Sequence, residues 1–517
     1  MAGEPPPDPP PGRPSTDLTR QTLSGLRWVY LGTMVGIVLQ FGMTAVLARL
    51  LTPAAFGLIA FAALFLRFAD YFADAGVTQA LIQKPALSSD DVRAAFTLSV
   101  GLGIAFGGIV LVAAPIAGEI GQDPELVPVL RWLALSLFIT GFSAPADAIL
   151  QRDLRFKPLA AIQVGSYVVG YVIVGLAMAA TGAGVYALVG ATLTQASVAS
   201  VSQYLLIRHP LLPSRARASY RAILGFGARV SVVGFLEFLQ SNLDTLAIGR
   251  WAGAAPLGLY NRANMLADLP GYHLTSGLSQ VLFPSFSAIQ HDRPRVLGAY
   301  LSGVGMTSAI VFPLNAGMAV AGSEIVLVML GAQWTGAIEV LPWLLLATSI
   351  GLVGNLAGVV TEAQAALNAK MVVSAVAAVT LGLLLLLAAG GPLAGYGAAL
   401  AATAAVFHTG YLLILTRTLQ TSFSSLIRPY GPSLLVAGIV AAAIAVCRLT
   451  LLQAGTAIGV VLIAEVAVGA ITLGLMFRFG PLRGLRRQFA RRLSDGGLMP
   501  GGSGVLMRGL AWVIGPP

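Results

Sequence analysis

The stretch WVYLGTMVGIVLQFGMTAVLARL (Trp28–Leu50) decides the fold class, because it holds a single charged residue, Arg49. About 20 apolar residues in a helix are enough to cross the ~30 Å hydrocarbon core of a bilayer. The whole chain shares this character: 56% of its 517 residues are hydrophobic, only 10% are charged, and the mean hydropathy is +0.83. A water-soluble fold of this size cannot bury so much apolar surface. The sequence therefore predicts an all-α integral membrane protein.

Apolar runs of similar length recur along the chain, each bounded by charged or polar residues. A window of about 20 residues predicts fourteen transmembrane helices. The predicted spans are residues 28–50, 56–81, 95–118, 126–150, 158–180, 184–207, 226–249, 256–284, 299–321, 336–360, 368–389, 393–416, 431–450 and 456–477.

Basic residues are concentrated in alternate loops, for example Arg152, Arg155 and Lys157 after the fourth span and Arg208 after the sixth. Loops rich in Lys and Arg stay in the cytoplasm, so both termini are predicted to be cytosolic. The distribution assigns the net charge of +10 to membrane topology and contact with anionic lipid, and not to nucleic acid.

The two ends of the chain differ from the spans. Residues 1–27 are proline-rich and lack the basic start of a signal peptide, so they predict a disordered cytosolic tail. Residues 479–517 begin with arginines interspersed with leucines and phenylalanine, which predicts a basic amphipathic cytosolic segment on the anionic leaflet.

An internal repeat is indicated by comparing the chain with itself at an offset of 201 residues. The offset pairs Arg49 with Arg250 and Asp91 with Asp292. Two lobes of six helices in the same orientation are expected from such a parallel repeat. The predicted organisation is an N-lobe (28–207), a basic linker (208–225), a C-lobe (226–416), and helices 13 and 14 (417–478).

Charged residues inside the predicted spans are candidates for function by default. Arg67, Asp70 and Asp74 are spaced i, i+3 and i+7, which places them on one face of a helix. The alternative is a structural Arg67–Asp70 pair within that helix. Arg131 and Asp147, near opposite ends of the fourth span, are interpreted as interfacial charges.

The second half of the chain has a similar set. Glu237 and Asp244 lie on one predicted face, and Asp268 follows them in the next helix. Arg229 and Arg262 lie near the ends of the same two helices, where snorkelling to the interface is the alternative role. Glycines such as Gly101, Gly103, Gly107 and Gly108 are typical of close helix packing.

Several strings resemble bacterial oligosaccharide and polysaccharide flippases of the multidrug/oligosaccharidyl-lipid/polysaccharide exporter superfamily. The first is LLTPAAFGLIAFAALFLRFADYFADAGVTQALIQK (Leu50–Lys84). The others are ILQRDLRFKPLA (Ile149–Ala160), LAIGRWAGAAPLGLYNRANMLADLP (Leu246–Pro270), LSQVLFPSFSAIQ (Leu278–Gln290) and MLGAQWTGAIEVLPWL (Met329–Leu344).

The resemblance implies a transporter, not an enzyme, in the bacterial cytoplasmic (inner) membrane. It would carry a polyprenyl-pyrophosphate-linked oligosaccharide across by alternating access for exopolysaccharide or lipopolysaccharide synthesis, beside a polysaccharide polymerase and export machinery. The alternatives are a cation-coupled multidrug antiporter of the same superfamily and a membrane polysaccharide polymerase or ligase.

The cargo's chemistry suggests roles for the charged residues. Arginine forms bidentate, charge-assisted hydrogen bonds with phosphate, so Arg67, Arg229 and Arg262 are expected to bind pyrophosphate. The carboxylates Asp70, Asp74, Glu237, Asp244 and Asp268 are expected to gate or to couple transport to protons or sodium ions; no cofactor is expected. The 201-residue offset aligns Arg67 with Asp268, which predicts a latch between the lobes.

Overall fold

The computed structural model describes residues 15–481 except 75, 85, 214–218, 221–222, 224–237, 239–240, 269–285, 287–288, 290 and 365; the side chains of 15–27, 74 and 367 are also outside the description. Every regular element among these residues is helical. The chain divides into two compact units, residues 1–242 and 243–517.

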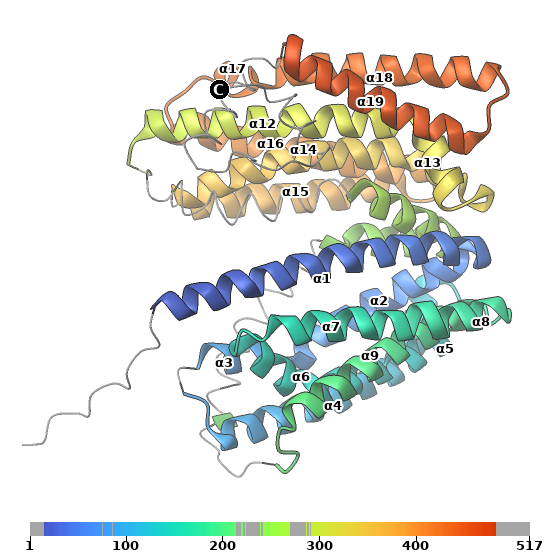
Figure 1. The fold of residues 1–517 in the computed structure, drawn as a ribbon, viewed down its shortest axis with the longest axis vertical. Helices are drawn as coiled ribbons and strands as arrows, with labels where there is room; N and C mark the ends of the chain where they lie inside the picture. Colours follow the sequence, from blue (N-terminus) through green and yellow to red (C-terminus); the bar gives the residue numbers. More distant parts are fainter. Residues whose placement is uncertain are drawn as a thin grey trace, which may run out of the picture. The chain divides into compact units, whose positions relative to one another are not determined.

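The first unit is a bundle built from long helices joined by short turns (Figure 1). Its elements are α1 (Ser15–Leu50), α2 (Pro53–Asp74), α3 (Val77–Gln83), α4 (Ser89–Gly121), α5 (Leu126–Leu133), α6 (Leu135–Arg152), α7 (Phe156–Tyr167), η1 (Val168–Gly175), α8 (Leu176–Ala180) and α9 (Val185–Ile207).

The second unit begins with helical residues 243–251, which continue the helix from 241, and with a helix over residues 254–268. Its further elements are α12 (Arg293–Val320), α13 (Gly322–Met329), η2 (Ala332–Trp334), α14 (Ala337–Ala363), α15 (Leu367–Ala388), α16 (Leu393–Thr418), α17 (Phe423–Ile427), α18 (Tyr430–Gln453) and α19 (Ile458–Phe479). In this unit α14 packs against α12 and α16, and α18 packs against α12 and α19.

Twelve helices of the described residues are long and apolar enough to cross a membrane. They coincide with twelve of the predicted spans, so the prediction of a multi-pass, all-α membrane protein is confirmed. The other two predicted spans, 226–249 and 256–284, lie largely outside the described residues, and the total of fourteen stays a prediction. One predicted span is divided: residues 126–150 form α5 and α6, which meet at Ala134.

Side-chain caps start α4 and α12, although the two aligned aspartates take different positions in them: Asp91 is the third residue of α4 and Asp292 is the N-cap of α12. Asp91 belongs to a capping box with Ser88, whose side chain accepts a hydrogen bond from the Asp91 amide at the start of α4. Asp292, its counterpart at the 201-residue offset, caps α12 by accepting a hydrogen bond from the Arg295 amide. Such caps satisfy amide groups that have no partner within the helix. In each unit a short helix, α5 or α13, then precedes the next long one.

Glycines allow α4 and α6 to approach closely. A Cβ at Gly103 would lie 2.6 Å from the Leu137 carbonyl oxygen, and a Cβ at Gly141 would lie 2.5 Å from the Ser99 carbonyl oxygen. Only a residue without a side chain fits at both positions. The predicted role of Gly103 in close packing is therefore confirmed, whereas Gly101 and Gly108 have no such neighbour.

Candidate functional site

A polar pocket of about 300 Å³ lies inside the first unit. Its walls come from α2, α3, α4, α6 and α9. Among the lining residues the polar ones are Asp70, Thr78, Ser99, Thr140, Ser143, Asp147 and Gln203. Polar groups inside a membrane-spanning bundle are costly unless they bind one another, water or a ligand. This pocket is therefore the candidate site of the first unit.

Asp147 organises one side of the pocket. Its Oδ1 accepts a hydrogen bond from Gln203 Nε2 of α9 at 3.0 Å, and its Oδ2 accepts one from Gln151 Nε2 at 2.6 Å. Two amide donors therefore hold a carboxylate that is half-buried. The interpretation of Asp147 as an interfacial charge missed this role, because Gln203 is 56 residues away in the sequence.

The structure describes the side chains of two residues of the predicted polar face of α2, and one of them reaches this pocket. Asp70 lines the pocket together with Ala73. Arg67 is exposed on the same helix, and among the described residues the ion pairs do not include an Arg67–Asp70 bridge. The choice between a functional and a structural role for this face stays a prediction. The side chain of Asp74 lies outside the described residues.

Three of the predicted residues of the second half, Asp244, Arg262 and Asp268, lie in the helices over residues 241–251 and 254–268. Asp244 accepts a hydrogen bond from the Tyr260 hydroxyl, which joins the two helices. Arg262 donates to Asn261 Oδ1 at 2.5 Å, and Asp268 accepts from Asn264 Nδ2 at 2.9 Å. Each charge therefore has a polar neighbour within its own unit.

Two predicted residues, Arg229 and Glu237, lie outside the described residues. Arg67 and Asp268 belong to different units, so the predicted latch between them stays a proposal.

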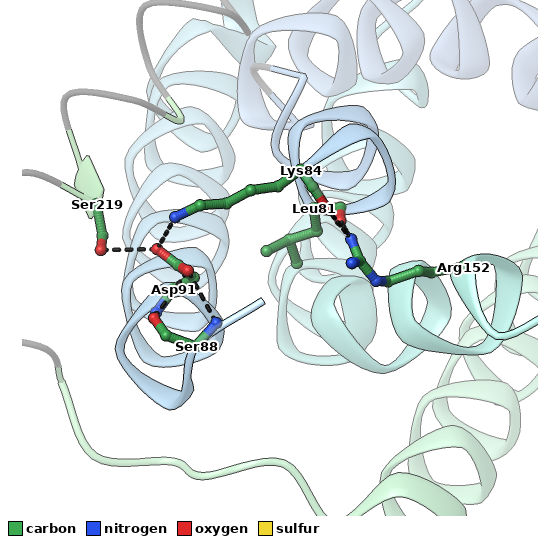
Figure 2. A network of polar contacts seen from close by, with 6 residues as sticks. All are labelled: Leu81, Lys84, Ser88, Asp91, Arg152 and Ser219. Atoms are coloured by element: carbon green, nitrogen blue, oxygen red, sulfur yellow. Dashed lines mark hydrogen bonds and ion pairs between the residues drawn. The ribbon is translucent and has the colours of Figure 1, made fainter. Parts of the chain in front are cut away.

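A polar network around the buried Asp91 ties together the end of α3, the start of α4, the end of α6 and the segment after α9 (Figure 2). Asp91 is 2% exposed; its Oδ1 pairs with Lys84 Nζ at 2.6 Å and accepts a hydrogen bond from Ser219 Oγ at 2.8 Å. Arg152 Nη1 donates to the carbonyl oxygens of Leu81, at 2.8 Å, and Lys84. The predicted basic linker is thus anchored, at Ser219, to the first unit.

His209, which follows α9, is buried among aromatic rings. Its ring centroid lies 5.2 Å from Phe96, 6.1 Å from Phe142 and 5.2 Å from Tyr204. Burial lowers the pKa of the imidazole below its ordinary value of 6.5. The group is therefore neutral at physiological pH.

The second unit holds a larger cavity of about 530 Å³ between α12, α14, α16 and α18. Most of its lining is apolar, with two polar pairs. Asn315 Nδ2 donates to Ser349 Oγ at 2.9 Å, and Tyr430 Oη lies 3.1 Å from His408 Nε2. The described residues include no group of three or more His, Cys, Asp or Glu that could hold a metal ion.

Comparison with known proteins supplies the family. Residues 46–339 match the model of a family described as "Polysaccharide biosynthesis protein". The lipopolysaccharide biosynthesis protein WzxC of Escherichia coli (strain K12) is 27% identical to this chain over 67% of it and 71% of the relative. The succinoglycan biosynthesis transport protein ExoT of Rhizobium meliloti (strain 1021) is 28% identical over 62% of this chain and 65% of the relative.

Solved structures show the same fold. The lipid II flippase MurJ, in an inward closed conformation, superposes with a TM-score of 0.66 at 12% identity, covering 90% of this chain and all of the flippase. An inward-facing multidrug resistance MATE family transporter of the MOP superfamily gives a TM-score of 0.52 at 16% identity, covering 77% of this chain and 99% of the transporter. At these identities the likeness concerns the fold alone.

Proposed function

This chain belongs to the polysaccharide biosynthesis protein family, and on that premise we propose that it carries a polyprenyl-pyrophosphate-linked oligosaccharide from the inner to the outer leaflet of the bacterial cytoplasmic membrane. It is a multi-pass membrane transporter related to polysaccharide biosynthesis transport proteins. The sequence predicts that the chain belongs to this family and that it is a transporter, not an enzyme, and both predictions are confirmed.

The observation that carries the proposal is the likeness to ExoT, whose name specifies succinoglycan biosynthesis transport. The physical requirement agrees with it. A sugar headgroup with a pyrophosphate cannot enter hydrocarbon, because each unpaired hydroxyl costs several kcal/mol and an ionised group far more. The polar pocket with Asp70 and Asp147 supplies polar groups inside one unit, as such a route needs.

Arg67 is the pyrophosphate-binding residue that we place first among Arg67, Arg229 and Arg262. Its side chain is exposed, whereas Arg262 already donates to Asn261 and to the Met265 sulfur. Asp70 is placed first among the ion-coupling carboxylates, because it lines the polar pocket. The domain boundaries from residue 28 onward, the cytosolic termini and the fourteen spans belong to the same proposal. The predicted disordered tail over residues 1–27 is wrong in part, because α1 already begins at Ser15.

The transport step is tested with the purified full-length chain in liposomes that contain a polyprenyl-pyrophosphate oligosaccharide with a fluorophore on the sugar. A membrane-impermeant quencher added outside reports how much headgroup exchanges between leaflets. We expect headgroup exchange in vesicles that contain the protein and no exchange in empty vesicles. We also expect no transport of a cationic drug by the protein. Drug transport without headgroup exchange would favour the antiporter and refute the proposal.

The role of Arg67 is tested by Arg67→Gln and Arg67→Lys. Loss of a charge-assisted hydrogen bond costs about 1.5–3 kcal/mol, or roughly a tenfold to hundredfold fall in the exchange rate. Lys keeps the charge without the bidentate geometry, so an intermediate rate is expected. Arg428→Gln is the matched control, since Arg428 is exposed at the end of α17. Equal rates for the Arg67 and Arg428 variants would contradict the assignment.

The proposed latch has its own test. Arg67→Asp and Asp268→Arg, each made alone, place like charges at the proposed contact, and the double reversal restores opposite charges. Partial recovery of exchange in the double variant is expected, and a double variant no faster than either single one would refute the latch.

A further inference from the structure

Glu465 is an acidic residue in the apolar run of α19, and none of its side chain is exposed. Neither of its carboxylate oxygens has a hydrogen-bond partner among the described residues. Buried carboxylates are nearly always hydrogen-bonded or paired. A carboxyl without a partner in a span therefore requires a physical explanation.

A second carboxylate and an arginine lie next to it. Glu324 of α13 is 3% exposed, and its Oε1 accepts a hydrogen bond from Arg448 Nε of α18 at 2.9 Å. Arg448 also donates from Nη2 to Ser323 Oγ at 2.7 Å. All three nitrogens of the guanidinium are directed to the α12–α13 side, because Nη1 donates to the Val320 carbonyl at 3.4 Å. The arginine is thus already engaged by Glu324 and its neighbours.

Helix packing places Glu465 level with Arg448. A Cβ at Gly469 of α19 would lie 3.1 Å from Ile444 Cδ1 of α18. The two helices are antiparallel neighbours joined by a short turn (Figure 1). Glu465 lies one turn from Gly469 toward the start of α19, and Arg448 lies one turn from Ile444 toward the end of α18. The two residues are therefore at the same height along the helix pair.

Few other charges reach this position from the described helices that pack on α19. Glu324 and Arg448 are the charged groups that act electrostatically on Glu465. The remaining ionisable side chains of these helices are Arg293, Arg295 and Tyr300 in the first turns of α12, Tyr430 at the first residue of α18, Cys447 beside Arg448, and Arg478 at the last turn of α19. The local charge is therefore set by two carboxyls and one guanidinium.

Charge balance decides the state of Glu465. With both carboxyls ionised the cluster would carry an excess negative charge on oxygens that have no donor, and burying an isolated ionised carboxylate costs far more than burying a neutral polar group. One proton makes the cluster neutral. We propose that Glu465 is a proton-binding site in the α18–α19 pair, with the proton held on its carboxyl while Arg448 is paired with Glu324.

The proton on Glu465 has a short path to water. Glu465 lies seven residues after Ile458, the first residue of α19, or about 10 Å along the helix at 1.5 Å per residue. As the pH rises, the proton would leave to water at the α18–α19 turn, and the Arg448 guanidinium would then be shared between the carboxylates of Glu324 and Glu465. The distribution of Lys and Arg predicts that this turn faces outward. The inference goes beyond the transported cargo and does not depend on its identity.

The site is tested by infrared difference spectra of the full-length protein in lipid nanodiscs, recorded between acidic and alkaline buffer. The wild type should show the carbonyl band of a protonated carboxyl that bleaches as the pH rises. Glu465→Gln and Glu465→Leu should both remove that band. Glu324→Gln should also weaken it, because Arg448 is then free to pair with an ionised Glu465. Glu339→Gln, at an exposed carboxylate of α14, is the matched control and should leave the band. Two variants of different polarity guard against a failure of one to fold, which thermal unfolding checks.

Three outcomes would overturn the proposal. The first is a wild-type spectrum without a protonated-carboxyl band, and the second is a band that persists in a folded Glu465 variant. The third is a band abolished by added sodium chloride at constant pH, which would make the occupant a metal cation. None of these readouts uses transport, so failure here and failure of the proposed flippase activity are distinguishable.

Discussion

Gly141→Ala should separate α4 from α6 and distort the polar pocket at the same time. The new methyl carbon would lie 2.5 Å from the Ser99 carbonyl oxygen, where ordinary contact begins at 3.4 Å. Backbone cannot move aside as a flexible side chain can, so the helices must part by about 0.9 Å. Overpacking of this kind costs about 1–3 kcal/mol. Ser99 and Gly141 both line the pocket, so its walls must move too.

Gly108→Ala is the matched control, because Gly108 lies on α4 with nothing within 4 Å of the added carbon. Both variants gain the same helix propensity, up to about 1 kcal/mol for replacing Gly by Ala, so the difference between them isolates the steric cost. Thermal unfolding of the purified proteins in one lipid should place Gly141→Ala several degrees below Gly108→Ala. Headgroup exchange at a temperature where both are folded should fall for Gly141→Ala alone. Equal unfolding midpoints would refute the reasoning about this contact.

Three further predictions concern the first unit. Asp147→Asn should slow headgroup exchange, because it removes the charge that two amide donors bind, and a hydrogen bond to a charged group contributes about 1.5–3 kcal/mol. Asp153→Asn, at an exposed carboxylate, is the control and should have no effect. Equal exchange rates for the two variants would contradict the assignment. Ser219→Ala should leave Asp91 paired with Lys84 but speed hydrogen exchange of the backbone near residue 219. Unchanged protection would mean that the Ser219–Asp91 hydrogen bond does not anchor the segment after α9. Because burial lowers the pKa of His209, the stability that the neutral imidazole contributes is present above pH 6.5 and is lost as the pH falls toward the folded-state pKa. The unfolding temperature of His209→Phe should therefore depend less on acid than that of the wild type. Identical pH profiles would show that protonation of His209 does not destabilise the fold.

The fold was largely predictable because hydrophobicity is a local signal. Twelve apolar runs became helices at the predicted places. Asp91 and Asp292, which the 201-residue offset pairs, both lie in the capping interactions at a helix start. Glycine packing was predictable only as a tendency. Gly103 and Gly101 are close in the sequence, but only Gly103 faces α6, and that depends on the rotation of the helix against its neighbour.

The candidate site was predictable only in part, because polar pairs form between helices. Spacing along α2 found Asp70, which lines the pocket. The Asp147–Gln203 contact needs α6 and α9 to be adjacent, and no pattern within either helix indicates that. Glu465 carried a usable signal, since a lone acid in a span is a candidate for function. Its lack of a hydrogen-bond partner could be seen only in the structure.

The thiol of Cys447 is a natural attachment point for a spectroscopic probe of helix movement. It is the sole cysteine in 517 residues, it is half-buried on α18, and it precedes the arginine that Glu324 binds. A spin label or fluorine probe attached there needs no cysteine-free background. Such a probe would sense rotation or displacement of α18 against α19 while every other side chain of the protein remains native.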